Sequence, residues 1–270
     1  MIHHDHHGTL VPALGLGTWE MNGDACVRGV EHALALGYRH LDTAQGYFNE
    51  VEVGVGLRRS GVPRDRVFLT TKVRPRYFAP ELLAPSVEAS LAALRVEHVD
   101  LVLLHWPRTD VPLEDTLGAL HAVRERGLTR HVGVSNFAPT WVARSVATGP
   151  IFTNQVEYHP FLSQDALLQQ AEALDLLLTA YAPVARGAVH DDPELRAIGA
   201  DHGKSAAQVA LRWLVQQPRV LAIPKAASPE HQRANLEIFD FALSDDEMAR
   251  VAALDRGMRL VDADDVDWER

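Results

Sequence analysis

The chain has 270 residues, of which 47% are hydrophobic, and its formal net charge is −10 at pH 7. The hydrophobic fraction is ample for a large buried core, and the negative charge argues against nucleic acid or an anionic membrane surface as a partner. The single cysteine, Cys26, has no second cysteine with which to form an intramolecular disulfide. A reducing, cytoplasmic setting is therefore expected.

The N-terminus is rich in histidine. It reads Met-Ile-His-His-Asp-His-His, which offers several groups that chelate metal ions. Nothing nearby indicates a fixed coordination geometry, so we interpret residues 1–9 as a flexible, solvated terminus and expect no metal site. No apolar run approaches the roughly 18 residues of a membrane span. We also expect no secretion signal, because no basic region precedes an apolar core.

Eight short apolar runs of strand length follow along the chain. They are Ala13–Gly17, Arg39–Asp42, Val67–Lys72, Val99–His105, His131–Ser135, Phe152–Glu157, Leu176–Tyr181 and Val220–Pro224. Stretches with helical spacing lie between many of them. Their apolar residues recur at three- and four-residue steps in Asp24–Leu36, at Val87, Leu91 and Leu94, at Leu117, Leu120 and Val123, at Leu167, Ala171 and Leu174, and in Ala207–Val215. Ser163 and Ser244 are helix start signals.

Eight strand–helix units over about 250 residues predict a closed (β/α)8 TIM barrel, an α/β fold, with a single domain over residues 1–270. The competing fold is a doubly wound sheet, which would carry a glycine-rich phosphate turn after its first strand. The strings Gly15-Leu-Gly17 and Gly54-Val-Gly56 both lack the third glycine of that turn. The barrel is therefore preferred, with its active site at the C-terminal strand ends.

Three of the apolar runs end on an ionisable residue: Asp42, Lys72 and His105. Tyr47 follows Asp42 by five residues. Parallel strands of a barrel deliver such side chains to one shared mouth. There, a buried Asp42 would pair with Lys72, whose ammonium would lower the pKa of Tyr47 towards neutrality. A phenol tuned in this way can give its proton to a carbonyl oxygen, and His105 can hydrogen-bond the same oxygen.

Each of these four residues also has an ordinary structural interpretation. A lone aspartate after a strand is most often a cap or a turn residue, a lone lysine is solvated, and a lone histidine is a packing residue. Their joint occurrence at the ends of successive strands favours the catalytic interpretation.

Six strings along the chain are distinctive: Leu-Gly-Leu-Gly-Thr-Trp19, Asp42-Thr-Ala-Gln-Gly-Tyr47, Leu-Leu-His105-Trp-Pro, Gly133-Val-Ser-Asn136-Phe, Asn154-Gln155-Val-Glu-Tyr158-His-Pro and Ile223-Pro-Lys225. Together they resemble the aldo-keto reductase family, and the similarity runs from about Val11 to Asp262. Within the family, the sequence is most similar to bacterial 2,5-diketo-D-gluconate and methylglyoxal reductases. The resemblance implies a catalytic tetrad of Asp42, Tyr47, Lys72 and His105, with Tyr47 as general acid. It also implies reversible reduction of an aldehyde or ketone by a nicotinamide cofactor.

The same resemblance implies a cofactor site. Ser135, Asn136 and Gln155 would hydrogen-bond the nicotinamide carboxamide, and Tyr181 would stack on the nicotinamide ring. In an alternative interpretation, Ser135 and Asn136 cap a helix and Gln155 forms hydrogen bonds at a strand end. This alternative is plausible for any one of the residues but weak for all of them together. The segment from Lys225 to Asn235, with His231, matches the part of the family that holds the adenosine 2′-phosphate.

This last segment departs from the usual family pattern at three positions. Ala226 stands where serine or threonine is usual, His231 where arginine is usual, and Ala234 where glutamate or glutamine is usual. Loss of a charged guanidinium contact costs on the order of 1.5–3 kcal/mol of preference for the phosphorylated cofactor, and Arg233 is a candidate to compensate. We therefore expect NADPH to bind, with NADH also accepted because discrimination is weak.

Aromatic residues are the candidates for a substrate pocket. They are Trp19, Tyr47, Phe48, Tyr77, Phe78 and Trp106, joined by Trp268 in a C-terminal tail, residues 255–270, expected near the substrate site. The short link after the fourth strand suggests an open site. Arg76 or Arg108 would attract a carboxylated keto-sugar, although a solvated surface charge explains either equally well.

Three functions remain open at this point. The first, which we favour, is reduction of small carbonyl compounds of the methylglyoxal or keto-sugar-acid type. The second is a nicotinamide-binding regulatory or structural protein with little turnover, and the intact tetrad argues against it. The third is a barrel lyase or isomerase of sugar phosphates, and the carboxamide clamp argues against that. The acidic surface, without an obvious apolar stripe, favours a monomer.

Overall fold

Eight parallel strands form the centre of the computed structural model, which describes residues 1–261. The strands are β3 (Leu16–Gly17), β4 (His40–Asp42), β5 (Phe68–Val73), β6 (Val99–Leu104), β7 (Thr129–Ser135), β8 (Thr153–Glu157), β9 (Leu177–Tyr181) and β10 (Val220–Ala222). They pair in chain order from β3 to β10. The ring closes because Gly15 N donates to Ala222 O (2.8 Å) and Gly17 N donates to Pro224 O (3.0 Å). The predicted barrel and its eight strands are confirmed.

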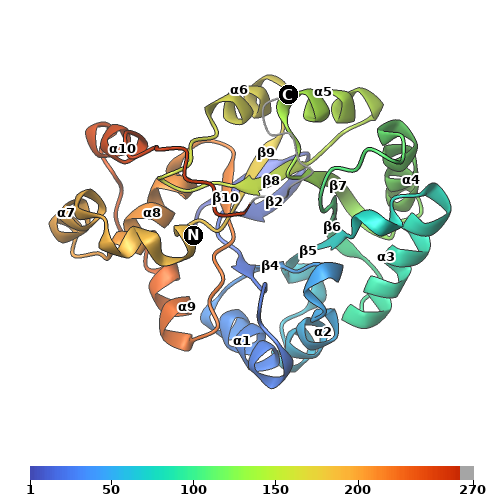
Figure 1. Cartoon of the computed structure of the whole chain (residues 1–270). Coiled ribbons are helices and arrows are strands. Elements are labelled where there is room, and N and C mark those ends of the chain that lie inside the picture. Colours follow the sequence, from blue (N-terminus) through green and yellow to red (C-terminus); the bar gives the residue numbers. More distant parts are fainter. Residues whose placement is uncertain (262–270) are drawn as a thin grey trace.

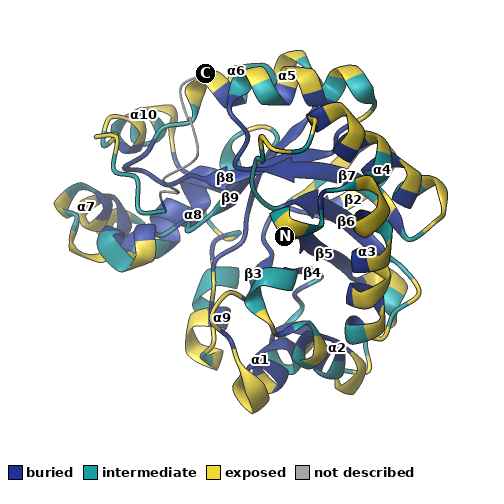
Figure 2. Cartoon of the chain, turned by 45° about the vertical axis from the view of Figure 1, so that its right-hand side comes forward, coloured by how far each residue is buried: buried dark blue, intermediate teal, exposed yellow. Residues whose placement is uncertain are grey.

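Helices surround this ring (Figure 1). They are α1 (Gly23–Leu36), α2 (Glu50–Arg59), α3 (Pro80–Leu94), α4 (Leu113–Glu125), α5 (Pro139–Thr148), α6 (Asp165–Ala173), α7 (Pro193–His202), α8 (Ala206–Gln216), α9 (Pro229–Leu236) and α10 (Asp245–Ala252). Short 3-10 turns are η1 (Gln45–Tyr47), η2 (Arg64–Arg66), η3 (Pro75–Tyr77) and η4 (Ala185–Asp191). Buried residues fill the strands and the inner helix faces, whereas exposed residues lie outside (Figure 2).

The sequence analysis did not predict some helices because their apolar residues do not recur regularly at helical spacing. Helix α9 has one buried residue, Gln232, and α5 has two, Val142 and Ser145. By contrast, the predicted start at Ser244 is confirmed, because this residue forms a capping box with Glu247 at the start of α10.

The glycine strings serve close packing and closure of the barrel. A Cβ atom on Gly17 would lie 2.6 Å from Ile223 O across the barrel seam, and one on Gly54 would lie 2.2 Å from Leu94 O, where α2 meets α3. Both glycines are therefore required because neighbouring backbone leaves no room for a Cβ atom.

The N-terminal residues are ordered as a hairpin, which corrects the expectation of a frayed terminus over residues 1–9. Strand β1 (His3–His6) pairs antiparallel with β2 (Thr9–Pro12). The hairpin lies over the N-terminal end of the barrel, where His4 Nε2 contacts Val220 O (3.1 Å) and Thr9 Oγ1 contacts His131 Nε2 (2.7 Å). Strand alternation turns His4 and His6 towards the barrel, and these long-range contacts hold a segment that has no local apolar pattern.

Within residues 1–261, no helix combines the length and the apolar character needed to span a bilayer.

Candidate active site

The four predicted catalytic residues come together at the C-terminal ends of adjacent strands. Asp42 ends β4, Tyr47 lies in η1, Lys72 lies near the end of β5, and His105 directly follows β6. The Lys72 ammonium forms an ion pair and hydrogen bond with Asp42 and donates to Tyr47 Oη over 3.2 Å. The rings of Tyr47 and His105 meet edge to face, with centroids 5.7 Å apart. The predicted grouping is therefore present in the fold.

Backbone geometry fixes this grouping. Lys72 Nζ also donates to Thr43 O (2.9 Å), so the chain after β4 is tied to β5. His105 N donates to Val73 O (3.1 Å), which continues the β5–β6 pairing by one residue and sets the start of the loop that carries the imidazole. Asp42 and Lys72 are fully buried, so each charge depends on the other for compensation.

Burial and charge act in opposite directions on the site. Burial raises the pKa of Tyr47, and Lys72 offsets this only in part. The expectation of a pKa drawn towards neutrality is therefore not met; the phenol keeps its proton at neutral pH. Burial opposes the Lys72 ammonium, but the Asp42 charge and hydrogen bonds with Asp42 and Tyr47 outweigh it and raise the pKa of Lys72. Burial, together with Lys72 and Arg74, lowers the pKa of His105 to about 3.

A second cluster of polar side chains adjoins the first. Ser135 Oγ donates to Gln155 O (2.8 Å), and Asn136 Nδ2 donates to His105 O (3.0 Å) and to Ser135 Oγ (3.2 Å). Tyr181 Oη donates to Asn136 Oδ1 (2.8 Å). Gln155 Nε2 donates to Asp42 Oδ2 (2.8 Å), which connects this amide cluster to the buried ion pair. The cluster is thus held rigidly by its own hydrogen bonds.

Both clusters open into one cleft with a volume of about 640 Å³. Among the sequence candidates, its walls include Asp42, Tyr47, His105, Ser135, Asn136, Gln155, Tyr181, Lys225, Trp19 and Trp106. Lys72 lies behind them, fully buried. The cleft therefore combines the proton-handling set with the amide cluster.

The structure places other candidates outside the walls of this cleft. Phe48 is 76% exposed, with Arg74 over its ring, and Tyr77 lies against Arg76. Phe78 is a core residue. Arg108 pairs with Asp110. Trp268 and the rest of the tail after residue 261 lie outside the described residues.

Helix α9 carries His231 and Asn235, which also lie outside the cleft walls. His231 is exposed in the first turn, where its backbone N–H is capped by Ser228. Asn235 lies one turn further along α9, near the hydroxyl of Tyr38, which donates to Gln232 O (2.9 Å). The buried Gln232 fixes the helix, because its Nε2 donates to Gly29 O and Ala226 O, each over 2.9 Å. Lys225 at the cleft and His231 in the first turn of α9 are both exposed.

The sequence analysis missed Arg186 on the cleft wall, whereas Val261, also on the wall, belongs to the tail, residues 255–270, that was expected near the substrate site. Arg186 lies on the wall with its guanidinium 5.0 Å from the Trp19 ring centre, in a segment where Ala182, Ala185 and Arg186 all have positive φ. Val261 closes another side, because buried Glu157 accepts hydrogen bonds from Leu260 N and Val261 N, each 2.8 Å. No local sequence pattern identifies Arg186 as a cleft residue. Glu157, in contrast, lies within the string Asn154-Gln155-Val-Glu-Tyr158, which the sequence analysis used for other residues.

The residues present fit a nicotinamide nucleotide. Tyr181 offers an aromatic face and the amide cluster offers fixed polar groups at the cleft wall, while Lys225 and Arg186 supply positive charge for phosphate groups. The net charge of −10 makes such local cations necessary for an anionic ligand.

An acid, a phenol, an amine and an imidazole at the C-terminal mouth of a (β/α)8 barrel define a barrel enzyme with a proton-transfer site. The chain belongs to the aldo/keto reductase family, whose sequence profile matches residues 13–256.

Individual relatives agree with this family. The chain is 38% identical to the aldo/keto reductase slr0942 of Synechocystis (96% of this chain, 90% of the relative) and 38% identical to morphine 6-dehydrogenase of Pseudomonas putida (97% and 94%). A crystal structure of a protein provisionally assigned as 2,5-diketo-D-gluconic acid reductase B matches with a TM-score of 0.98 and 47% identity over 100% of this chain and 98% of that one. The protein is thus an oxidoreductase of small carbonyl compounds that uses a nicotinamide nucleotide, NADH or NADPH.

Proposed function

We propose that the protein reduces small aldehydes or ketones, of the methylglyoxal or keto-sugar-acid type, to alcohols with NADPH, and that Tyr47 is the general acid. The observation that carries this proposal is the buried chain of contacts from Asp42 through Lys72 to the Tyr47 hydroxyl, which faces the cleft beside the amide cluster. The bound cofactor supplies the hydride.

Tyr47 is suited to give a proton. Its raised pKa keeps the hydroxyl protonated at neutral pH, so the acid form is present when a carbonyl oxygen gains negative charge. Lys72, 3.2 Å from the hydroxyl oxygen, stabilises the phenolate that remains. Asp42 in turn holds Lys72 in place and compensates its charge.

His105 acts as a neutral hydrogen-bonding group. A pKa of about 3 leaves the imidazole uncharged throughout the neutral range, so it can orient a carbonyl oxygen but has no extra proton to transfer. The edge-to-face contact with Tyr47 brings both polar groups to the same side of the cleft. We therefore assign the proton transfer to Tyr47 alone and orientation to His105.

The substrate and cofactor follow from the cleft walls. Trp19 and Trp106 suit a small carbonyl compound, and Arg186 suits a carboxylate or phosphate. Ser135, Asn136, Gln155 and Tyr181 are proposed to hold the nicotinamide, and Lys225, with His231 and Asn235 beyond it, the 2′-phosphate end. With His231 in place of the usual arginine, NADH is accepted as well.

The test is the initial rate of reduced-nicotinamide consumption with methylglyoxal, with NADPH and NADH in parallel. Tyr47→Phe is expected to lower kcat by about 10²–10⁴-fold, because it removes the proton donor. Tyr158→Phe is the matched control, since it removes a buried hydroxyl that bonds Gln217 away from the cleft. A Tyr47→Phe rate equal to wild type would refute the assignment. Cofactor binding by wild type without turnover of any carbonyl compound in a panel would favour a nicotinamide-binding protein instead.

A further inference from the structure

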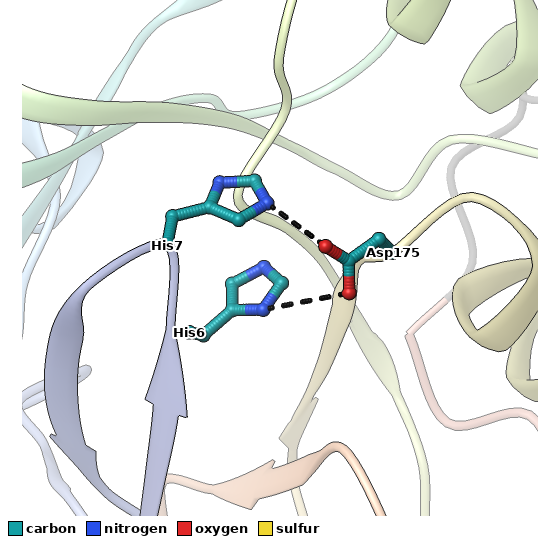
Figure 3. A group of neighbouring side chains, drawn as sticks. All are labelled: His6, His7 and Asp175. Atoms are coloured by element: carbon teal, nitrogen blue, oxygen red, sulfur yellow. Dashed lines mark ion pairs between the residues drawn. The ribbon is translucent and has the colours of Figure 1, made fainter.

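His6, His7 and Asp175 gather at the end of the barrel opposite the cleft. His6 ends β1, His7 begins the hairpin turn, and Asp175 lies between α6 and β9 (Figure 3). His7 Nε2 lies 3.3 Å from Asp175 Oδ2, and His6 Nδ1 lies 4.0 Å from Asp175 Oδ1. The three nearest ligand atoms all lie within 4.8 Å of one another. Two imidazole nitrogens and a carboxylate oxygen therefore lie close together, although their segments are about 170 residues apart in the chain.

His6 is an unusual buried histidine. Its side chain is 4% exposed, its Nε2 has no hydrogen-bond partner among the residues described, and its Nδ1 is too far from Asp175 for a hydrogen bond.

The rings are also held in position. His6 and His7 stack with their centroids 4.0 Å apart, and Phe152 meets the His6 ring edge to face at 4.9 Å. Both His7 and Asp175 have positive φ, 48° and 54°, and Figure 3 shows their side chains directed towards each other. The remaining histidines of the terminal run are placed differently: His4 contacts Val220 O, and His3 is exposed.

We propose that His6, His7 and Asp175 bind a divalent transition-metal ion, with Zn²⁺ as the best match to the donor set. Two imidazole nitrogens and one carboxylate oxygen are ligands that Zn²⁺ accepts, with water as the fourth. Tetrahedral coordination with bonds near 2.0 Å separates ligand atoms by about 3.3 Å. The His7–Asp175 pair already has this separation, and the donor atoms of the three residues, which lie within 4.8 Å of one another, must close by up to about 1.5 Å.

Arg219 competes with a metal for the same carboxylate. Its Nη1 donates to Asp175 Oδ1 over 2.7 Å, and the positive charge opposes a nearby cation. Removal of this guanidinium should therefore strengthen metal binding, whereas loss of the Asp175 charge should weaken it. These opposite directions distinguish the site from unspecific binding by a histidine-rich strand.

A bound metal would join the hairpin to the loop before β9. The hairpin also contacts the barrel through hydrogen bonds, through the His6 ring against Phe152, and through Val11, which is part of the core. Because a ligand that binds only the folded state stabilises it, Zn²⁺ should raise the midpoint of thermal unfolding.

The experiment is calorimetric titration of the untagged full-length protein with ZnCl₂ at pH 7.5. Wild type is expected to bind one ion, and Asp175→Asn is expected to lower the affinity at least about tenfold, since even outer-shell partners of metal ligands contribute 10–100-fold. Asp5→Asn is the matched control, because it makes the same change on the exposed side of β1 in the same hairpin. Arg219→Ala is expected to bind Zn²⁺ more tightly than wild type.

Other results would overturn the proposal. Absence of zinc binding by wild type would do so, as would equal affinity of Asp175→Asn and wild type, because the ion would then be held by the exposed histidines alone. An equal loss in Asp5→Asn and Asp175→Asn would show that only general negative charge matters. Thermal unfolding gives an independent readout, with a zinc-dependent rise in wild type and Asp5→Asn that is absent in Asp175→Asn.

Discussion

The environment of His105 affects both its proposed role and the stability of the fold. The same environment that lowers its pKa to about 3, namely burial with the Lys72 and Arg74 charges, keeps it neutral for hydrogen bonding. The unfolded chain binds a proton at this histidine near pH 6.5, whereas the folded chain does so only near pH 3. Between these two values the unfolded state holds more protons, so the folded state loses stability as the pH falls.

His105→Gln should therefore make stability less sensitive to acid. Urea unfolding at pH 7.5 and at pH 4.5 measures the fall in the free energy of unfolding, which should be smaller in the variant than in wild type. A part of the fall should remain, because burial also lowers the pKa of His6 and His131 to about 4. An unchanged fall in His105→Gln would contradict the neutral, buried state that we assign.

We propose that a single side chain, His231, sets the cofactor preference. It is exposed in the first turn of α9, and an arginine there would add a guanidinium for a 2′-phosphate. His231→Arg should raise the ratio of kcat/KM for NADPH to that for NADH by about tenfold or more, equivalent to 1.5–3 kcal/mol for a charged hydrogen bond. His98→Arg, just before β6 at the other end of the barrel, is the control. The proposed position of the phosphate would be wrong if both variants kept the wild-type ratio.

At the scale of elements, one buried carboxylate holds the C-terminal segment against the barrel. Glu157 at the end of β8 accepts from His159 Nε2 (2.9 Å) as well as from Leu260 N and Val261 N. Burial opposes the charge, but these hydrogen bonds outweigh it and lower the pKa of Glu157. Their contribution is thus present above the ordinary glutamate range and is lost as the pH falls through the lowered value.

Glu157→Gln should loosen this segment without unfolding the barrel. Charged hydrogen bonds are worth about 1.5–3 kcal/mol, so amide hydrogen exchange at Leu260 and Val261 should accelerate at least about tenfold. Glu172→Gln, an exposed change on α6, should leave exchange at both amides as in wild type. Equal protection of the two amides in wild type and Glu157→Gln would show that other contacts hold the segment.

At the scale of the whole molecule, the barrel depends on closure between its first and last strands. Gly17 lies at this seam, where an added Cβ would meet Ile223 O at 2.6 Å, and the obstructing atom is backbone. Gly118, on α4, has nothing within 4 Å of its Cβ position. The same substitution at the two glycines should therefore have opposite effects.

Gly17→Ala should destabilise the protein by about 1–3 kcal/mol through overpacking at the seam. Gly118→Ala should stabilise it by up to about 1 kcal/mol, since alanine favours a helix interior over glycine. Chemical denaturation of both variants and wild type measures these changes. A Gly17→Ala protein as stable as wild type would mean that the seam can widen without cost.

The sequence alone was sufficient for the features that depend on local pattern. The eight strands were predicted because each is a short apolar run, and the site around Asp42, Lys72 and His105 because parallel strands bring their C-terminal ends together. The family resemblance was confirmed by the sequence profile over residues 13–256. These features need only neighbouring residues and the topology of a barrel.

Tertiary structure decided the features that depend on contacts between distant segments. The hairpin is ordered by the barrel end beneath it, α9 is fixed by Gln232, and Val261 reaches the cleft because Glu157 binds its backbone. Burial, rather than the Lys72 charge, sets the direction of the Tyr47 pKa shift. Burial and long-range hydrogen bonds arise only when segments far apart in the chain meet, so a local sequence pattern cannot predict them.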